Sequence, residues 1–207
     1  MLRSTLKTPT PTYQYCAFRF LDLWERDEKS LHGDMQGTPS ADQIRNVLNH
    51  YRVARNFKGL SHEGAKQISE DLVEMSDVKG SYSDKVMLLA ERFKNKFGQR
   101  NLSAASKLLW LRNRSSYLIF DKRAADGLRR LGNKINDYKS FCDAWHREYE
   151  KQYREITLAA RGLVSLPRTY MRNPSLTDDE LTDLVQKDWF IARVFDIYLW
   201  EIGDKNV

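Results

Sequence analysis

A carboxylate and a lysine lie in the most basic part of the chain. Asp121 follows the apolar run Tyr-Leu-Ile-Phe at 117–120, and Lys107 belongs to the preceding segment SAASKLLWLRN at 103–113. A carboxylate can stabilise a developing positive charge or activate a nucleophile, and a lysine amine can form a Schiff base. Each residue also has a structural interpretation, because aspartate is a favoured helix N-cap and a lysine on a basic helix commonly contacts phosphate or solvent.

The positive charge of the chain is regional. The whole sequence has 34 Lys and Arg, 28 Asp and Glu and a formal net charge of +6. Residues 100–172 hold sixteen basic and seven acidic residues, a difference of +9, and the remaining eighteen basic and twenty-one acidic residues differ by −3. Such an asymmetric field attracts polyanions, and nucleic acid is the commonest polyanion of a cytoplasm. The alternative is a solvated helix surface without a partner.

The composition predicts a protein with a substantial core and mostly helical structure. Of its 207 residues, 41% are hydrophobic and 12% aromatic, while ten Gly and five Pro favour long helices over strands and turns. There is no run of eighteen apolar residues, and the start of the chain lacks the apolar segment of a signal peptide. We therefore expect a cytoplasmic protein without membrane contact.

Several familiar chemistries lack their residues. The sequence contains no HExxH, GxxxxGK[ST], GxGxxG or GxSxG motif. Cys16 and Cys142 lie far apart without the spacing of a zinc site, which favours two small buried hydrophobes in a reducing compartment. We expect neither a metal site nor a cofactor.

Hydrophobic spacing and capping residues predict a series of helices. Ser40 with Gln43, and Thr177 with Glu180, form capping-box patterns, while the Thr- and Pro-rich start predicts a mobile extended arm at residues 1–15. We expect an all-α, multi-helix fold, either as a single domain of residues 1–207 or as two small helical lobes. The expected helices cover residues 16–28, 40–57, 61–75, 83–98, 103–113, 122–132, 137–162 and 177–203.

Two similar tetrapeptides lie near the ends of the chain. RFLD at 19–22 and RVFD at 193–196 each place an arginine three residues before an aspartate in an aromatic-rich helix. This spacing predicts an ion pair on one helix face and favours docking of the two terminal helices on each other.

Residues 98–131 combine basic charge with a core-like apolar pattern. A short helix with small residues at Ala104 and Ala105 precedes the turn RNRSS. The run at 117–120 should be extended and buried, and it leads to Asp121 as the cap of a helix that stops at Gly132. The apolar residues would face the core while the basic residues face outward.

This order resembles the helix-hairpin-helix DNA glycosylase superfamily, particularly the branch similar to 8-oxoguanine DNA glycosylases. SAASKLLWLRN resembles the second helix of that hairpin, and LIFDKRAADGL resembles the segment with the aspartate. In the family, the hairpin backbone holds DNA phosphates and the aspartate assists the departure of a flipped-out base. The resemblance therefore implies duplex DNA with an extruded base as partner and Asp121 as the catalytic carboxylate.

The chain also departs from the family pattern. The usual Gly-x-Gly turn is replaced by FGQRNLSAAS, in which Gly98 and Asn101 tolerate left-handed geometry. The position of the nucleophilic lysine of bifunctional members is Ser103, and Lys107 lies one helical turn later as its candidate substitute.

The leading hypothesis is a DNA-binding protein of glycosylase type that excises a damaged or modified base. Trp110 or Tyr117 would stack on the extruded base, although Trp110 also fits the core. One alternative is a non-catalytic nucleic-acid- or partner-binding helical protein, such as an accessory component of a bacterial genome-defence system. Another is a structural adaptor whose positive face meets an acidic protein. The residues expected to contact the nucleic acid are Arg100, Asn101, Ser103, Lys107, Arg112, Arg114, Lys122 and Arg123.

Overall fold

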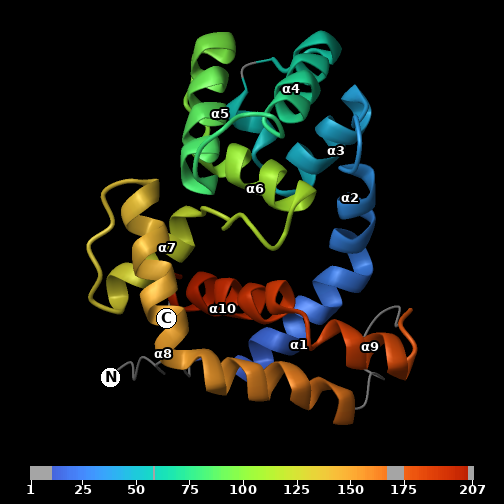
Figure 1. Cartoon of the computed structure of the whole chain (residues 1–207), viewed down its shortest axis with the longest axis vertical. Coiled ribbons are helices and arrows are strands. Elements are labelled where there is room, and N and C mark those ends of the chain that lie inside the picture. Colours follow the sequence, from blue (N-terminus) through green and yellow to red (C-terminus); the bar gives the residue numbers. More distant parts are fainter. Residues whose placement is uncertain (1–10, 58, 167–174, 205–207) are drawn as a thin grey trace, which may run out of the picture. The chain divides into compact units, whose positions relative to one another are not determined.

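All regular elements in the described part of the chain are helical. The computed structural model describes residues 11–57, 59–166 and 175–204, and within these ranges it contains no β-strand (Figure 1). The predicted all-α class is confirmed. Contacts divide the chain into two compact units, a first unit of residues 1–25 and 121–207 and a second unit of residues 26–120. The single domain of residues 1–207 stays a prediction.

The described residues of the second unit form five α-helices, and most of these helices have a polar N-cap residue. The Ser40–Gln43 capping box is confirmed, and Ser61 caps the next helix through the Gly64 N–H. The helix predicted from residue 83 begins at Tyr82, because Ser81 and Asp84 form a reciprocal capping box. The elements are α2 (Lys29–Asp34), α3 (Ala41–His50), η2 (Ala54–Asn56), α4 (His62–Glu74), α5 (Tyr82–Phe97) and α6 (Leu102–Arg112).

The core of the second unit surrounds α6. This helix packs against α5 and α2, while α3 packs against α4 (Figure 1). Residues Ala104–Leu111 are all buried, so α6 has no solvent face along most of its length. A helix that is apolar around its circumference belongs in a core. The polar residues on α6 therefore have to find partners inside the protein.

The first unit contains the two ends of the chain. The five-residue π-helix η1 (Trp24–Glu28) carries the chain from the first unit into the second. The other elements are α1 (Tyr13–Leu23), α7 (Lys122–Arg130), α8 (Tyr138–Arg161), η3 (Gly162–Ser165), α9 (Asp178–Leu184) and α10 (Asp188–Ile202). The predicted docking of the two terminal helices is confirmed, because α10 lies against α1 as well as α7 and α8 (Figure 1).

Two boundaries in the first unit differ from the sequence prediction. The extended arm predicted over residues 1–15 is wrong for residues 13–15, because Thr12 accepts the Tyr15 N–H and starts α1 at Tyr13. Residues 1–10 of that arm lie outside the described residues. The helix predicted over 177–203 is two helices, because the Lys187 N–H turns back to the Leu184 carbonyl at 3.1 Å and ends α9.

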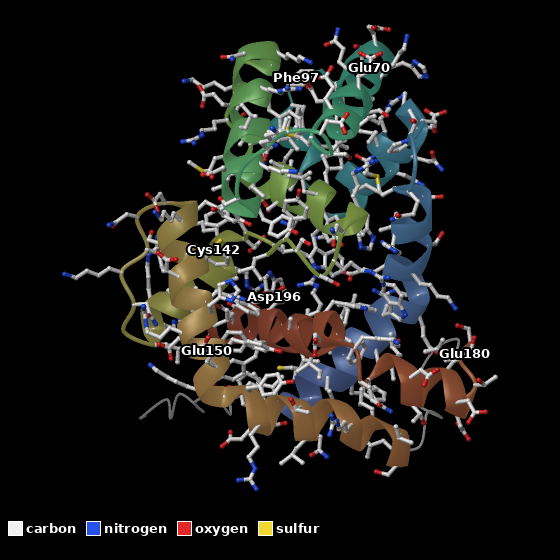
Figure 2. All side chains as sticks on the ribbon, viewed as in Figure 1. Glu70, Phe97, Cys142, Glu150, Glu180 and Asp196 are labelled. Atoms are coloured by element: carbon white, nitrogen blue, oxygen red, sulfur yellow. The ribbon has the colours of Figure 1, made fainter. Side chains whose placement is uncertain are left out.

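Buried polar groups of α10 organise the core of the first unit. Trp145 donates its indole N–H to Asp196 at 2.6 Å, and Arg193 lies 3.6 Å from the same carboxylate, as its spacing predicted (Figure 2). Burial raises the pKa of the thiols of Cys16 and Cys142 to about 12 in each case. The predicted burial is confirmed for Cys16, whereas Cys142 is only partly buried.

Two glycines allow α7 and α10 to meet backbone to backbone. A Cβ atom at Gly127 would overlap the carbonyl oxygen of Leu199, and one at Gly203 would overlap the carbonyl oxygen of Arg123. Arg130 then donates to the Ile202 carbonyl at 2.6 Å across the same contact. The N-terminal end of α7, which carries Asp121, is positioned by this close approach.

Replacement of Gly127 by alanine is expected to destabilise the first unit. The new methyl group has no space against the Leu199 backbone, so we expect Gly127→Ala to lower the free energy of unfolding by about 1–3 kcal/mol. Urea unfolding followed by tryptophan fluorescence measures this change. The matched control is Gly33→Ala, because Gly33 lies in α2 with open space around its Cα and alanine favours a helix by about 0.5–1 kcal/mol. A neutral Gly127→Ala variant would contradict the close contact.

Candidate functional site

The turn between α5 and α6 occupies residues 98–101 of the second unit. Gly98 ends α5 with a left-handed backbone (φ +74°) and donates its N–H to the Lys94 carbonyl at 2.8 Å. Asn101 has φ −103° and caps α6 by accepting the Ala104 N–H at 3.1 Å. Left-handed geometry is therefore needed at Gly98 and not at Asn101. The first backbone N–H groups of α6, at Leu102 and Ser103, have no helical acceptor and suit an anion.

Two predicted phosphate contacts lie at this turn with different exposure. Arg100 is exposed, and its guanidinium lies 3.4 Å from the Glu91 carboxylate. Asn101 is only 3% exposed, and its side-chain oxygen also accepts from the Asn56 amide at 3.4 Å. Asn101 thus holds the turn in place, while Arg100 is open to a ligand.

Lys107 and Ser103 form a buried pair on one face of α6. The Lys107 ammonium donates to the Ser103 hydroxyl at 2.6 Å, as the i, i+4 spacing predicted, and the lysine is 5% exposed. Its nitrogen lies 5.7 Å from the centre of the Tyr51 ring, and the Tyr51 hydroxyl donates to buried Glu28 at 3.2 Å. Neither Glu28 nor Tyr51 was predicted as a site residue, because no local sequence pattern marks a contact with Lys107.

The C-terminal end of α6 is fixed by the segment around α2. Arg112 donates to the carbonyl oxygens of Met35 at 3.2 Å and Gly37 at 2.8 Å. His32 lies with its Nδ1 atom 2.5 Å from the Leu111 carbonyl oxygen, to which it donates when Nδ1 is protonated. Arg114 is half-buried, and this burial lowers its pKa to about 10 although the Glu28 carboxylate opposes the shift. Arg112 and Arg114 therefore serve the fold in this structure rather than projecting toward a phosphate.

Neither aromatic residue predicted to stack on a base is exposed. Trp110 is 2% exposed and Tyr117 is 8% exposed, so the core interpretation of Trp110 is confirmed. The Tyr117 ring packs against that of Tyr82 at a centroid distance of 5.2 Å. Tyr82 is half-exposed, so its ring is accessible to solvent, unlike the rings of Trp110 and Tyr117.

Residues 117–120 lie outside any helix, and one hydrogen bond attaches them to α6. The Phe120 N–H donates to the buried Ser106 hydroxyl at 2.9 Å. Tyr117 and Ile119 are buried in this run, whereas Leu118 and Phe120 are partly exposed. The backbone immediately before Asp121 is therefore held by a side chain of the central helix of the second unit.

Asp121 follows this run and is the residue at which the chain returns to the first unit. Its backbone is extended, and its side chain accepts the Arg123 N–H at 2.9 Å, which confirms the predicted N-cap of α7. The carboxylate is partly exposed. It lies at the N-terminal end of α7.

The two basic residues after Asp121 have different surroundings. Lys122 is exposed. The Arg123 guanidinium lies 3.3 Å over the centre of the Trp200 ring and forms an ion pair with Asp204. Of these two predicted phosphate contacts, Lys122 is accessible, while Arg123 is occupied by contacts within the first unit.

Comparisons with known proteins leave the site to be interpreted from its own geometry. The chain has no match among protein-family models, curated proteins or solved structures. In residues 11–57, 59–166 and 175–204, no three His, Cys, Asp or Glu side chains are grouped to hold a metal ion. The described helices include none that is long and apolar enough to span a membrane.

The burial of His32 predicts a dependence of stability on pH. Burial lowers the pKa of His32 from its usual 6.5, so the unfolded chain binds a proton more readily than the folded chain. The contribution of neutral His32 is complete above pH 6.5 and is lost as the pH falls below that value. We expect the melting temperature to fall less between about pH 7.5 and about pH 5.5 in His32→Gln than in the wild type.

Circular dichroism at the two pH values measures this difference. His146 is exposed on α8, so His146→Gln serves as a control that should keep the wild-type response to pH. An identical response of His32→Gln and the wild type would contradict the role given to burial of His32.

Proposed function

We propose that this protein binds DNA and acts as a DNA glycosylase, with Asp121 as the carboxylate that assists departure of an extruded base. The observation that carries the proposal is the fixed position of Asp121. Within the first unit, the aspartate caps α7 through the Arg123 N–H at 2.9 Å, and its carboxylate is partly exposed. A partly exposed carboxylate held at the start of a helix suits a catalytic role, because catalytic groups need a preorganised position.

The reaction requires little more than a carboxylate and water. As the N-glycosidic bond breaks, positive charge develops on the sugar, and the negative charge of Asp121 stabilises it. Water adds to the anomeric carbon and gives up a proton to the carboxylate or to solvent, while the leaving base takes up one proton from solvent. The α5–α6 turn would hold the DNA backbone through the N–H groups of α6 and through Arg100.

A second route would use Lys107 as a nucleophile. Its amine would attack the anomeric carbon, the base would leave, and the sugar would open to a Schiff base. The pair of Lys107 with Ser103 supports this route, because the partly exposed hydroxyl at 2.6 Å can relay the proton that the ammonium group loses to solvent.

A non-catalytic DNA-binding protein is the alternative proposal. The burial of Trp110 and Tyr117 favours it, since neither predicted stacking ring is open to an extruded base. Under this alternative, which includes an accessory role in bacterial genome defence, DNA affinity depends on salt but no base is released. A structural adaptor would lack the salt-dependent affinity as well.

Base release by the wild type and by Asp121→Asn tests the leading proposal. Asparagine caps a helix nearly as well as aspartate, so the variant removes the charge and keeps the fold. We expect a panel of duplexes with damaged or modified bases, followed by heating in alkali, to reveal strand cleavage that Asp121→Asn slows by about 10²–10⁴-fold. An unchanged melting temperature confirms the fold of the variant. Cleavage at the wild-type rate in Asp121→Asn would contradict the role of this carboxylate.

Borohydride trapping tests Lys107 separately. If Lys107 forms a Schiff base, reduction during turnover links the protein to DNA, and Lys107→Met abolishes the link while filling the same buried space. Lys94→Met is the control, because Lys94 is exposed and paired with Glu91 at 3.0 Å. A link that persists in Lys107→Met would assign the amine to another lysine. Base release without a covalent link between protein and DNA would favour the mechanism in which water attacks the sugar and Asp121 stabilises its charge.

A further inference from the structure

Three arginines of the second unit are exposed and have no partner among the described residues. Arg45 lies on α3, Arg52 directly after it and Arg55 in η2, and none of them makes an ion pair, hydrogen bond or ring contact with the described part of the chain. By contrast, Arg92 and Lys96 of the same unit are paired with Asp71. The positive charge of Arg45, Arg52 and Arg55 is therefore available to a ligand.

Few acidic residues lie near these arginines in the sequence. Residues 43–62 contain four basic residues and no Asp or Glu, and Asp42 lies three residues before Arg45. The predicted basic region at residues 100–172 does not include this stretch, because acidic residues on both sides offset its charge. Residues 43–62 therefore carry a local excess of positive charge.

One of the arginines lines a hollow of the right polarity for an anion. The hollow has a volume of about 270 Å³. Its charged residue is Arg45, and Asn49 adds an amide one helical turn later. Phe57 also lines the hollow, and its buried ring packs edge-on against the rings of Phe93 and Phe97. Phe97 is labelled in Figure 2. The described residues that line it are Arg45, Asn49, Ala54, Phe57, Gly59 and Leu60, and none of these carries a carboxylate.

Arg52 occupies a backbone position that favours glycine. Its φ is +54°, and it is the non-glycine residue with positive φ in the described chain. The Arg52 N–H bonds to the Asn49 carbonyl and the Val53 N–H to the Leu48 carbonyl, both at 2.9 Å, which is the Schellman end of a helix. Glycine is the common residue at this left-handed position, so an exposed arginine here bears a conformational cost that stability does not explain.

We propose that Arg45, Arg52 and Arg55 form an arginine surface that binds the phosphate backbone of DNA, as a contact distinct from the α5–α6 turn. Guanidinium groups bind phosphate with paired N–H donors and keep their charge at any physiological pH. The loop is tied to the turn by the hydrogen bond from Asn56 to Asn101, the cap of α6. Both contacts therefore belong to one packed unit and can hold one DNA molecule together.

The same surface fits nucleic acid better than an acidic protein. Protein interfaces need an apolar centre, and the exposed large hydrophobic residues of the described second unit are Tyr82 and Leu88, both on α5. None lies on α3 or in residues 51–60. The proposal rests on the DNA-binding part of the proposed function and does not require base release.

Binding of a fluorescent duplex, measured by anisotropy over a range of salt concentrations, tests the arginine surface. We expect Arg45→Gln/Arg52→Gln/Arg55→Gln to weaken binding roughly tenfold or more and to reduce the salt slope by about 2.7, at about 0.9 for each lost phosphate contact. The matched control is Lys29→Gln/Lys66→Gln/Lys79→Gln, which removes the same charge from exposed lysines of the same unit close to acidic residues. Equal binding by the two triple variants would overturn the proposal.

Arg52→Gly separates binding from folding. Glycine relieves the left-handed backbone, so the melting temperature should stay the same or rise. The affinity for the duplex should nevertheless fall, with a salt slope reduced by about 0.9. An affinity equal to that of the wild type would remove Arg52 from the surface and overturn the assignment of its strained position.

Further measurements distinguish a failure of this proposal from a failure of the proposed function. Polyglutamate is added as a competitor at a charge concentration equal to that of the duplex. Displacement of the duplex by polyglutamate would indicate a site for an acidic protein and overturn the DNA assignment. A wild-type chain without salt-dependent duplex affinity would overturn both proposals. Duplex binding lost in the arginine variant, together with no base release from any lesion, would support the arginine surface and overturn the glycosylase proposal alone.

Discussion

Burial of α6 on all sides is the constraint on which the second unit depends. Because residues Ala104–Leu111 have no access to solvent, every polar group on this helix must bond within the protein. Ser106 accordingly accepts the Phe120 N–H, and Lys107 donates to Ser103. The same requirement that satisfies these groups also fixes residues 117–120 and the turn before α6. The packing of the second unit and the position of that turn are therefore consequences of one buried helix.

The first unit depends on a different contact, the backbone approach of α7 and α10. Gly127 and Gly203 remove the side chains that would separate the helices, and Arg130 bonds across the gap. The approach places Arg123 over Trp200 and beside Asp204, so this arginine is held within the unit. Asp121 caps α7 one turn before this contact. Its position follows from a rigid helix pair and not from a surface loop.

Charge in this protein divides into paired and unpaired groups, and the division carries the functional argument. Arg112 binds backbone carbonyls, and Arg92 is paired with Asp71, so these cations stabilise the fold. Arg45, Arg52 and Arg55 have no described partner, and Arg52 holds an unfavourable backbone conformation. Cations without an internal partner keep their hydration and their long-range field, which makes them the groups best suited to bind an external polyanion.

The sequence alone determined the features that depend on residues close together in the chain. The capping boxes at Ser40 and Thr177, the left-handed stop at Gly98, the cap at Asp121 and the Lys107–Ser103 pair all follow from side chains within one helical turn. Tertiary structure decided which side chains face solvent. It buried Trp110 and Tyr117, bound Arg112 to Met35 and Gly37, and left the arginines after α3 exposed. Burial and pairing depend on partners far away in sequence, and no local pattern encodes those partners.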